Sequence, residues 1–216
     1  RIASYASVAV AFILIVAKTS AWLATDSIAV LSSLIDSFLD ALASIVTLIA
    51  IRHSLQPADR EHRFGHGKVE ALAALAQSAF IVGSAVLLLF EAGARSLDPQ
   101  EITRGNVAIY VMLFSIALTF MLVLIQRWAI RKSGSVAISA DSLHYTGDLL
   151  MNAAVIVAIL LVTELGWTMA DPVFGAGIAA YIIWSAYRIV RNSLDMLMDR
   201  ELPDDEREKI RAIALT

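Results

Sequence analysis

The sequence predicts an all-α fold, a bundle of six transmembrane helices with both termini in the cytoplasm. Three observations lead to this prediction: the composition, the spacing of long apolar segments and the placement of basic residues. Hydrophobic residues make up 58% of the 216 residues and charged residues 17%, with a mean hydropathy of +0.72. Soluble domains average about 45–50% apolar and 25% charged residues. We therefore expect the chain to lie in a membrane.

Long apolar segments divide the chain. A bilayer core of about 30 Å requires roughly 20 apolar residues per helix, because backbone polar groups cannot stay unpaired in hydrocarbon. The segments that meet this requirement are residues 2–24, 28–51, 69–93, 106–130, 136–164 and 173–198. We expect a tight turn at Ala24-Thr25-Asp26, and breaks at Asp98-Pro99 and Asp171-Pro172.

Two regions follow from this division. Residues 1–200 form the predicted six-helix transmembrane domain. After Pro203, the acids at 204–206 and the later Lys209 have the pattern of a helix start. That helix is polar, so we expect residues 201–216 to be the start of a cytoplasmic C-terminal domain that this chain truncates.

Lysine and arginine residues concentrate on one side of the predicted bundle, which the positive-inside rule assigns to the cytoplasm. The loops and tail on that side hold Arg52, Arg60, Arg63, Lys68, Arg127, Arg131, Lys132, Arg188, Arg191, Arg200, Arg207, Lys209 and Arg211. The opposite side has only Arg95 and Arg104. Lys18 lies near the outer end of the first segment, where a lysine can snorkel to the surface.

Several function classes are disfavoured. Without cysteine there is no disulfide framework, Cys-type zinc site or thiol chemistry. The net charge of −3 and the dispersed basic residues argue against a nucleic-acid partner.

The second and fifth segments each contain a pair of ionisable residues that is costly in a membrane. Asp36 and Asp40 lie four residues apart, as do His144 and Asp148, so each pair occupies one face of its helix. The two segments run antiparallel, and counting from their inner ends places both pairs at similar depth. We expect Asp40 to face His144 and Asp36 to face Asp148, which makes a four-ligand metal site.

Three carboxylates and one imidazole suit Zn²⁺, with Cd²⁺, Fe²⁺ and Mn²⁺ as alternatives. An empty site of three acids should take up protons that a bound metal expels, which is a basis for metal/proton exchange. The other interpretation is a set of interhelical hydrogen bonds or a proton relay without metal. Asp141, one turn before His144, is interpreted as an ordinary acid near a helix N-terminus or as an attractor of cations.

A second candidate site lies in the loop after the second segment. Asp59, His62 and His66 have ligand-like spacing, and the neighbouring Gly65 and Gly67 allow the backbone to fold around an ion. Spacing alone leaves a metal site and a solvated charged loop equally open.

Small residues also mark two other segments. They are Ala71, Ala74 and Ser78 in the third and Gly175, Gly177 and Ala180 in the sixth. They favour close helix packing, within a monomer or across a dimer.

Taken together, these residues resemble a known family. The two ligand pairs and the stretch Phe64-Gly65-His66-Gly67-Lys68-Val69-Glu70 are similar, over the whole chain, to the cation diffusion facilitator family. The resemblance implies a homodimeric Zn²⁺/proton antiporter of the cell inner membrane, which exports metal from the cytoplasm by alternating access. It implies no covalent chemistry and hence no enzyme.

The resemblance also implies roles for single residues. Asp36, Asp40, His144 and Asp148 match the transport site, where Zn²⁺ is the substrate. Asp59, His62 and His66 match a loop zinc site. Lys68 and Asp199 match a charge interlock of the dimer, and Leu143 matches a gate position.

The sequence alone does not exclude other functions. A metal-gated channel would use the same ligands without coupled proton flux, and a membrane metal sensor would bind metal without moving it. A membrane hydrolase would need an open metal position and an activating base, and the sequence has no HExxH motif.

Overall fold

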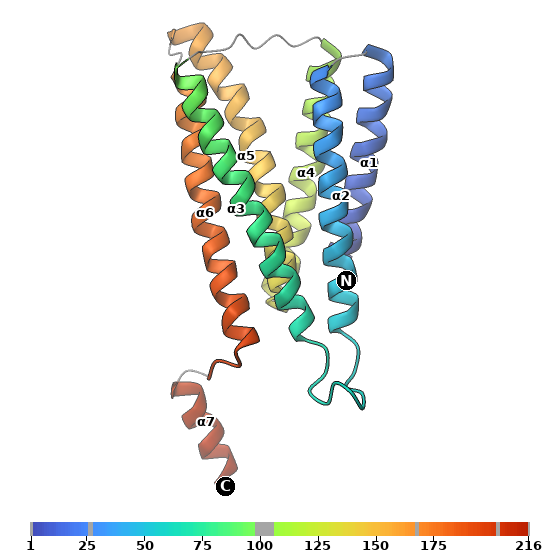
Figure 1. Cartoon of the computed structure of the whole chain (residues 1–216), viewed down its shortest axis with the longest axis vertical. Coiled ribbons are helices and arrows are strands. Elements are labelled where there is room, and N and C mark those ends of the chain that lie inside the picture. Colours follow the sequence, from blue (N-terminus) through green and yellow to red (C-terminus); the bar gives the residue numbers. More distant parts are fainter. Residues whose placement is uncertain (1, 26–27, 98–105, 167–168, 202–203, 216) are drawn as a thin grey trace.

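The computed structural model describes residues 2–25, 28–97, 106–166, 169–201 and 204–215, and these residues are helical except in the connections (Figure 1). The helices are α1 (Ile2–Thr25), α2 (Ile28–Ser54), α3 (Lys68–Leu97), α4 (Asn106–Ser133), α5 (Val136–Leu165), α6 (Ala170–Leu197) and α7 (Asp204–Ala214). Within this described part no strand occurs, which confirms the all-α prediction.

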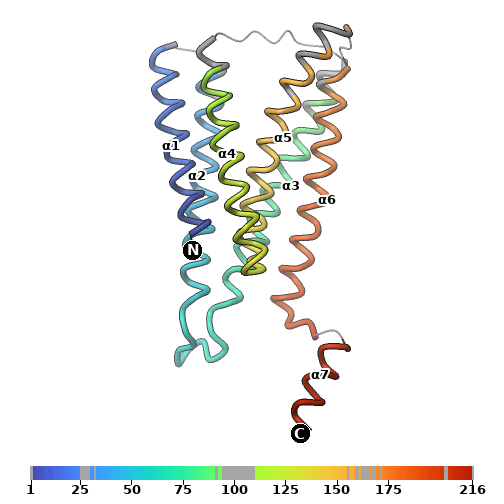
Figure 2. Tube along the Cα trace, turned by 180° about the vertical axis from the view of Figure 1, so that it is seen from behind, coloured from blue at the N-terminus to red at the C-terminus, as the bar shows by residue number. Residues whose placement is uncertain are grey.

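The long helices form two groups. α1 packs against α2 and α4, whereas α3, α5 and α6 pack against one another. Contacts of α2 with α3 and α5, and of α4 with α5, join the groups. The groups lie closest in the half of the bundle near the α2–α3 loop and diverge toward the other end (Figures 1 and 2).

The helices extend beyond the apolar segments that predicted them. α2 continues to Ser54 and α4 to Ser133, and their last turns carry Arg52, His53, Arg131 and Lys132. Arg52, Arg131 and Lys132 complement the partial negative charge at a helix C-terminus, so the helix continues past the hydrocarbon.

One predicted break is wrong. α6 begins at Ala170, so Asp171-Pro172 lies inside its first turn. Proline is tolerated there because the first N–H groups of a helix have no helical partner. The breaks expected at Asp26 and at Asp98-Pro99 lie outside the described residues.

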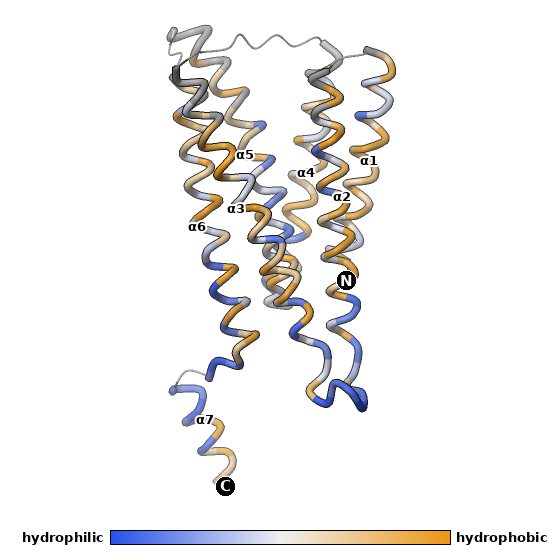
Figure 3. Tube along the Cα trace, viewed as in Figure 1, coloured by the Kyte–Doolittle hydropathy of each residue, from blue (hydrophilic) through white to orange (hydrophobic). Residues whose placement is uncertain are grey.

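Five helices are long and apolar enough to cross a membrane, counting described residues only: α1, α2, α3, α4 and α6. Hydrophobic residues are frequent along these helices, and hydrophilic residues gather in the α2–α3 loop and in α7 (Figure 3). This count covers only part of α5, since several of its residues after Ala154 lie outside the described side chains. The chain is thus a multi-pass membrane protein.

The small residues of α3 are used within this chain. Ala71, Ala74 and Ser78 are fully buried, and the first two pack with Val136 and Ala140 at the start of α5. On α6, a methyl group placed at Gly175 would meet the Cβ of Ala92 at 3.5 Å. The small residues therefore let α3 approach both α5 and α6 closely.

Candidate metal sites

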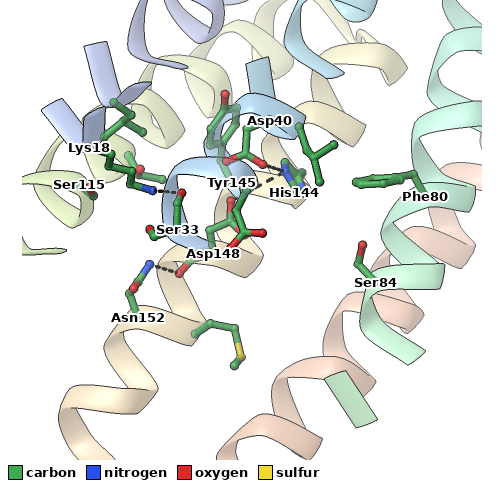
Figure 4. Close-up of a pocket in the computed structure, with 15 residues that line it drawn as sticks. Lys18, Ser33, Asp40, Phe80, Ser84, Ser115, His144, Tyr145, Asp148 and Asn152 are labelled. Atoms are coloured by element: carbon green, nitrogen blue, oxygen red, sulfur yellow. Dashed lines mark hydrogen bonds and ion pairs between the residues drawn. The ribbon is translucent and has the colours of Figure 1, made fainter. Parts of the chain in front are cut away.

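The two predicted ligand pairs meet between α2 and α5. Nε2 of His144 lies 2.6 Å from Oδ1 of Asp40 and 3.8 Å from Oδ2 of Asp148 (Figure 4). One ligand atom from each of these residues lies within 4.8 Å of the other two. The expectation that Asp40 faces His144 across antiparallel helices agrees with this geometry.

These ligands line a cavity of about 370 Å³ between the helices. The side chains of Asp40 and His144 are each 14% exposed, whereas that of Asp148 is 43% exposed. The rings of Phe80 and Tyr145 pack edge-on near His144. An ion in the cavity could therefore reach the accessible Asp148 first. The enclosed Asp40 and His144 could then hold it at the cavity wall.

Asp36 lies in the same cavity but outside the group of three. It is one turn before Asp40 on α2 and lines the cavity, yet its carboxylate does not join the cluster of ligand atoms. The fourth expected ligand, Asp36, thus lines the cavity without joining this group.

Lys18 is a cavity residue that sequence reasoning missed. Its Nζ donates hydrogen bonds to the Ser37 hydroxyl at 2.7 Å and to the Ser33 carbonyl at 3.0 Å, both on α2. The side chain thus turns into the bundle instead of snorkelling outward. The available signal was a lysine within an apolar segment, a position that favours a polar partner.

Asp141 is neither a helix-end acid in water nor an exposed attractor of cations. It is 1% exposed and accepts hydrogen bonds from Gln126 at 2.8 Å, Ser44 at 3.2 Å and Gln77 at 3.4 Å. Ser44 also pairs with the Tyr145 hydroxyl at 2.9 Å. Asp141 therefore joins α2, α3, α4 and α5 beside the cavity.

The predicted gate residue is part of the apolar core. Leu143 is 7% exposed and packs with Ile81, Ala85, Ala179, Ile182 and Ala186. Near it, a Cβ at Gly147 would lie 2.9 Å from Cδ1 of Ile182. Glycine between His144 and Asp148 thus brings α6 directly against the helix face that carries the ligands.

The loop residues Asp59, His62 and His66 also come together. Their ligand atoms lie within 4.8 Å of one another, with Asp59 Oδ1 3.2 Å from His62 Nδ1 and Oδ2 3.5 Å from His66 Nε2. Gly65 has φ +80, which places it in the left-handed region that glycine tolerates. This turn brings His66 back to Asp59.

Hydrogen bonds preorganise the loop acid. The backbone N–H groups of His62 and Glu61 donate to Asp59 Oδ1 at 2.6 and 2.9 Å. The His62 N–H is the main reason why the pKa of Asp59 is lowered. A carboxylate that is ionised at low pH is suited to a cation.

His66 has an unused buried nitrogen. Its side chain is 5% exposed, and among the described residues its Nδ1 has no hydrogen-bond partner. The nitrogen that lies toward Asp59 is the other one, Nε2.

Lys68 and Asp199 form an ion pair within this chain. Lys68 Nζ lies 2.8 Å from Asp199 Oδ2 and also donates to the Leu197 carbonyl at 3.2 Å. The pair connects the start of α3 to the segment after α6.

Comparison with known proteins identifies the family. The model of the cation efflux transmembrane domain matches residues 4–198. The cation-efflux pump FieF of Shewanella oneidensis is 49% identical over 214 residues, which cover 99% of this chain and 72% of that protein. FieF of Pectobacterium carotovorum is 47% identical over 209 residues, 97% of this chain and 69% of the relative. FieF of Yersinia pestis is 47% identical over 211 residues, which cover 97% of this chain and 70% of that protein. The chain therefore belongs to the cation diffusion facilitator family and is a membrane transporter for divalent metal cation efflux, not an enzyme.

Proposed function

We propose that the chain exports Zn²⁺ from the cytoplasm in exchange for protons. The observation that carries the proposal is the meeting of Asp40, His144 and Asp148 within 4.8 Å at the wall of a cavity inside the bundle. Nitrogen and carboxylate ligands suit Zn²⁺, and Cd²⁺, Fe²⁺ and Mn²⁺ are the alternative substrates. Asp36 supplies the fourth ligand once α2 adjusts around the ion.

Proton exchange follows from the charges of the cavity. Carboxylates crowded in a low-dielectric environment repel one another and take up protons when no metal is bound. A divalent ion displaces those protons, because metal ligands must be deprotonated. Metal and protons therefore occupy the same groups in alternation.

Alternating access requires a second conformation. α5 is buried along most of residues 136–147, on the loop side of the cavity, and is half-buried over residues 148–152. We infer that the bundle is closed toward the α2–α3 loop and open toward the other end. In the second conformation the helices around Leu143 and Asp141 move apart, which opens the cavity toward the α2–α3 loop. Leu143 is then the gate.

The complete assembly is proposed as follows. Six helices, α5 included, span the inner membrane with both termini in the cytoplasm, so the basic α2–α3 loop and α7 lie inside the cell. Residues 1–200 are the transport domain, and 201–216 begin a cytoplasmic domain. The chain acts as a homodimer in which Lys68 and Asp199 stabilise the contact region, and Asp59, His62 and His66 hold a further Zn²⁺.

Zinc flux into lipid vesicles with an imposed pH gradient tests this function. We expect wild-type protein to move Zn²⁺ with opposing proton flux, and Asp40→Ala to lose at least about 90% of both, since removal of a ligand costs tenfold or more in metal binding. Asp195→Ala, an acid near the end of α6, is the matched control. Equal flux in wild type and Asp40→Ala would refute the site, and Zn²⁺ flux without proton movement would indicate a channel. Zinc binding with no flux in any variant would indicate a sensor.

A further inference from the structure

One cation of the protein itself faces the metal cavity. Among the described residues that line the cavity, Lys18 is the only lysine or arginine, and it shares the space with Asp36, Asp40 and Asp148 (Figure 4). Two hydrogen bonds to α2 hold its ammonium group in place. The side chain is therefore fixed beside the carboxylates and is not a mobile surface charge.

We propose that Lys18 is a specificity-determining residue of the transport site, a built-in counter-cation that lowers the cavity's attraction for metal and matches its charge to a divalent ion. The proposal rests on the transport site proposed above. It concerns a residue of α1, a helix that supplies none of the ligands.

The position of the two acceptors supports this role. Ser33 and Ser37 lie on α2 on either side of Asp36, so the ammonium group is presented to the helix that carries two of the acids. A charge inside a membrane is costly unless it is compensated, and the carboxylates of the cavity provide that compensation. Lys18 lines the same cavity as Asp36, Asp40 and Asp148.

The charge balance gives the functional consequence. In the loaded cavity the ligands are deprotonated, so three carboxylates and a neutral His144 contribute −3 and a divalent ion brings the total to −1. With the Lys18 ammonium included, the loaded cavity is neutral, which is the least costly state in a low-dielectric interior. A monovalent ion leaves the cavity negative and a trivalent ion leaves it positive. Lys18 also repels the incoming metal, so it weakens binding and favours release.

A purely structural role predicts the opposite effect on binding. If Lys18 only fastened α1 to α2, its removal would loosen Asp36 and Asp40 and weaken the metal site. If it acts by charge, removal strengthens binding. The sign of the change therefore separates the two roles.

Zinc affinity is measured by chelator competition on the full chain in nanodiscs, with His62→Ala and His66→Ala in every variant to eliminate loop binding. We expect Lys18→Gln to bind Zn²⁺ roughly tenfold or more tightly than the parent, because a like charge is removed. Lys18→Arg keeps the charge and should match the parent. Ser37→Ala removes one tether but no charge, and should stay within about twofold. Lys132→Gln, a lysine stacked on Trp128 outside the cavity, is the control.

The outcomes distinguish this proposal from the proposed function. Unchanged or weaker binding in Lys18→Gln overturns the counter-cation role, and weaker binding in both Lys18→Gln and Ser37→Ala assigns a tethering role instead. If Asp40→Ala binds as the parent does, the transport site itself is wrong. Lys18→Met, which keeps the apolar stem, is measured alongside, so that a folding defect of one neutral variant does not decide the result.

Discussion

His144 presents a single nitrogen to two carboxylates from different helices. Its Nε2 faces Asp40 on α2 and Asp148 on its own helix, and this is the only nitrogen ligand in the group of three. Imidazole favours Zn²⁺ over harder ions, whereas a site of carboxylates alone suits Mn²⁺ and Mg²⁺. The preference of the cavity for zinc should therefore depend on this one side chain.

We predict that His144→Asp narrows the ratio of Zn²⁺ to Mn²⁺ affinity by about tenfold or more, mainly through loss of zinc binding. Competition titrations with both metals, on protein lacking the loop histidines 62 and 66, measure this ratio. His53→Asp introduces the same change outside the cavity and should leave the ratio unaltered. A ratio that is unchanged in His144→Asp would mean that cavity shape, and not the imidazole, selects the metal.

Sequence reasoning located the ligands but not their surroundings. The i, i+4 spacing of two pairs on apolar segments was enough to bring Asp40 to His144, because helix geometry fixes both the face and the depth. Helix geometry does not predict the direction of the Lys18 side chain. A lysine near a helix end can extend to the membrane surface or turn into the bundle, and here the inward direction depends on hydrogen bonds to Ser33 and Ser37 of α2.

Four helices meet at one buried carboxylate. Asp141 on α5 accepts hydrogen bonds from Ser44 of α2, Gln77 of α3 and Gln126 of α4. Gln126 also donates to Ser7 of α1 at 3.0 Å, which extends the network to a fifth helix. If Asp141 is removed, three buried donors lose an acceptor at once.

We predict that Asp141→Ala lowers the free energy of unfolding by about 3 kcal/mol, because buried polar groups are left unpaired. Asp195→Ala breaks an accessible ion pair with Arg200 and should cost less than about 1 kcal/mol. Denaturant unfolding in detergent, followed by tryptophan fluorescence, compares the two. Equal costs would show that the hydrogen bonds around Asp141 contribute little to stability.

At the level of the helices, the apolar segments gave the order and the approximate positions of α1 to α6, but not their ends. Hydropathy marks where the side chains are apolar, whereas a helix continues as long as its backbone bonds and terminal charges are satisfied. For the same reason the sequence predicts a break at Asp171-Pro172, whereas this pair lies in the first turn of α6. The pairing of α3 with α6 through small residues was one of two open options, and only the packed structure selects it.

The whole bundle is described in one conformation, whereas the proposed alternating access needs two. On the loop side of the cavity, the start of α5 is packed against α3 at Ala71 and Ala74 and against α6 at Leu143. On the other side, cavity residues such as Ser84 are exposed. We therefore expect water-soluble reagents to reach the cavity from the side opposite the α2–α3 loop, and not from the loop side.

Since the chain has no cysteine, single-cysteine variants can report that accessibility without background. We predict that Ser84→Cys reacts with a membrane-impermeant maleimide added from the side opposite the α2–α3 loop, whereas Ala74→Cys, at a fully buried position, is protected in the resting protein. During zinc transport down an imposed gradient, labelling of Ala74→Cys from the loop side should rise several-fold, because the closed side must open in each cycle. Leu113→Cys, exposed on the outer surface of α4, is the control whose labelling transport should not change. Constant labelling of Ala74→Cys under active transport would contradict alternating access through this cavity.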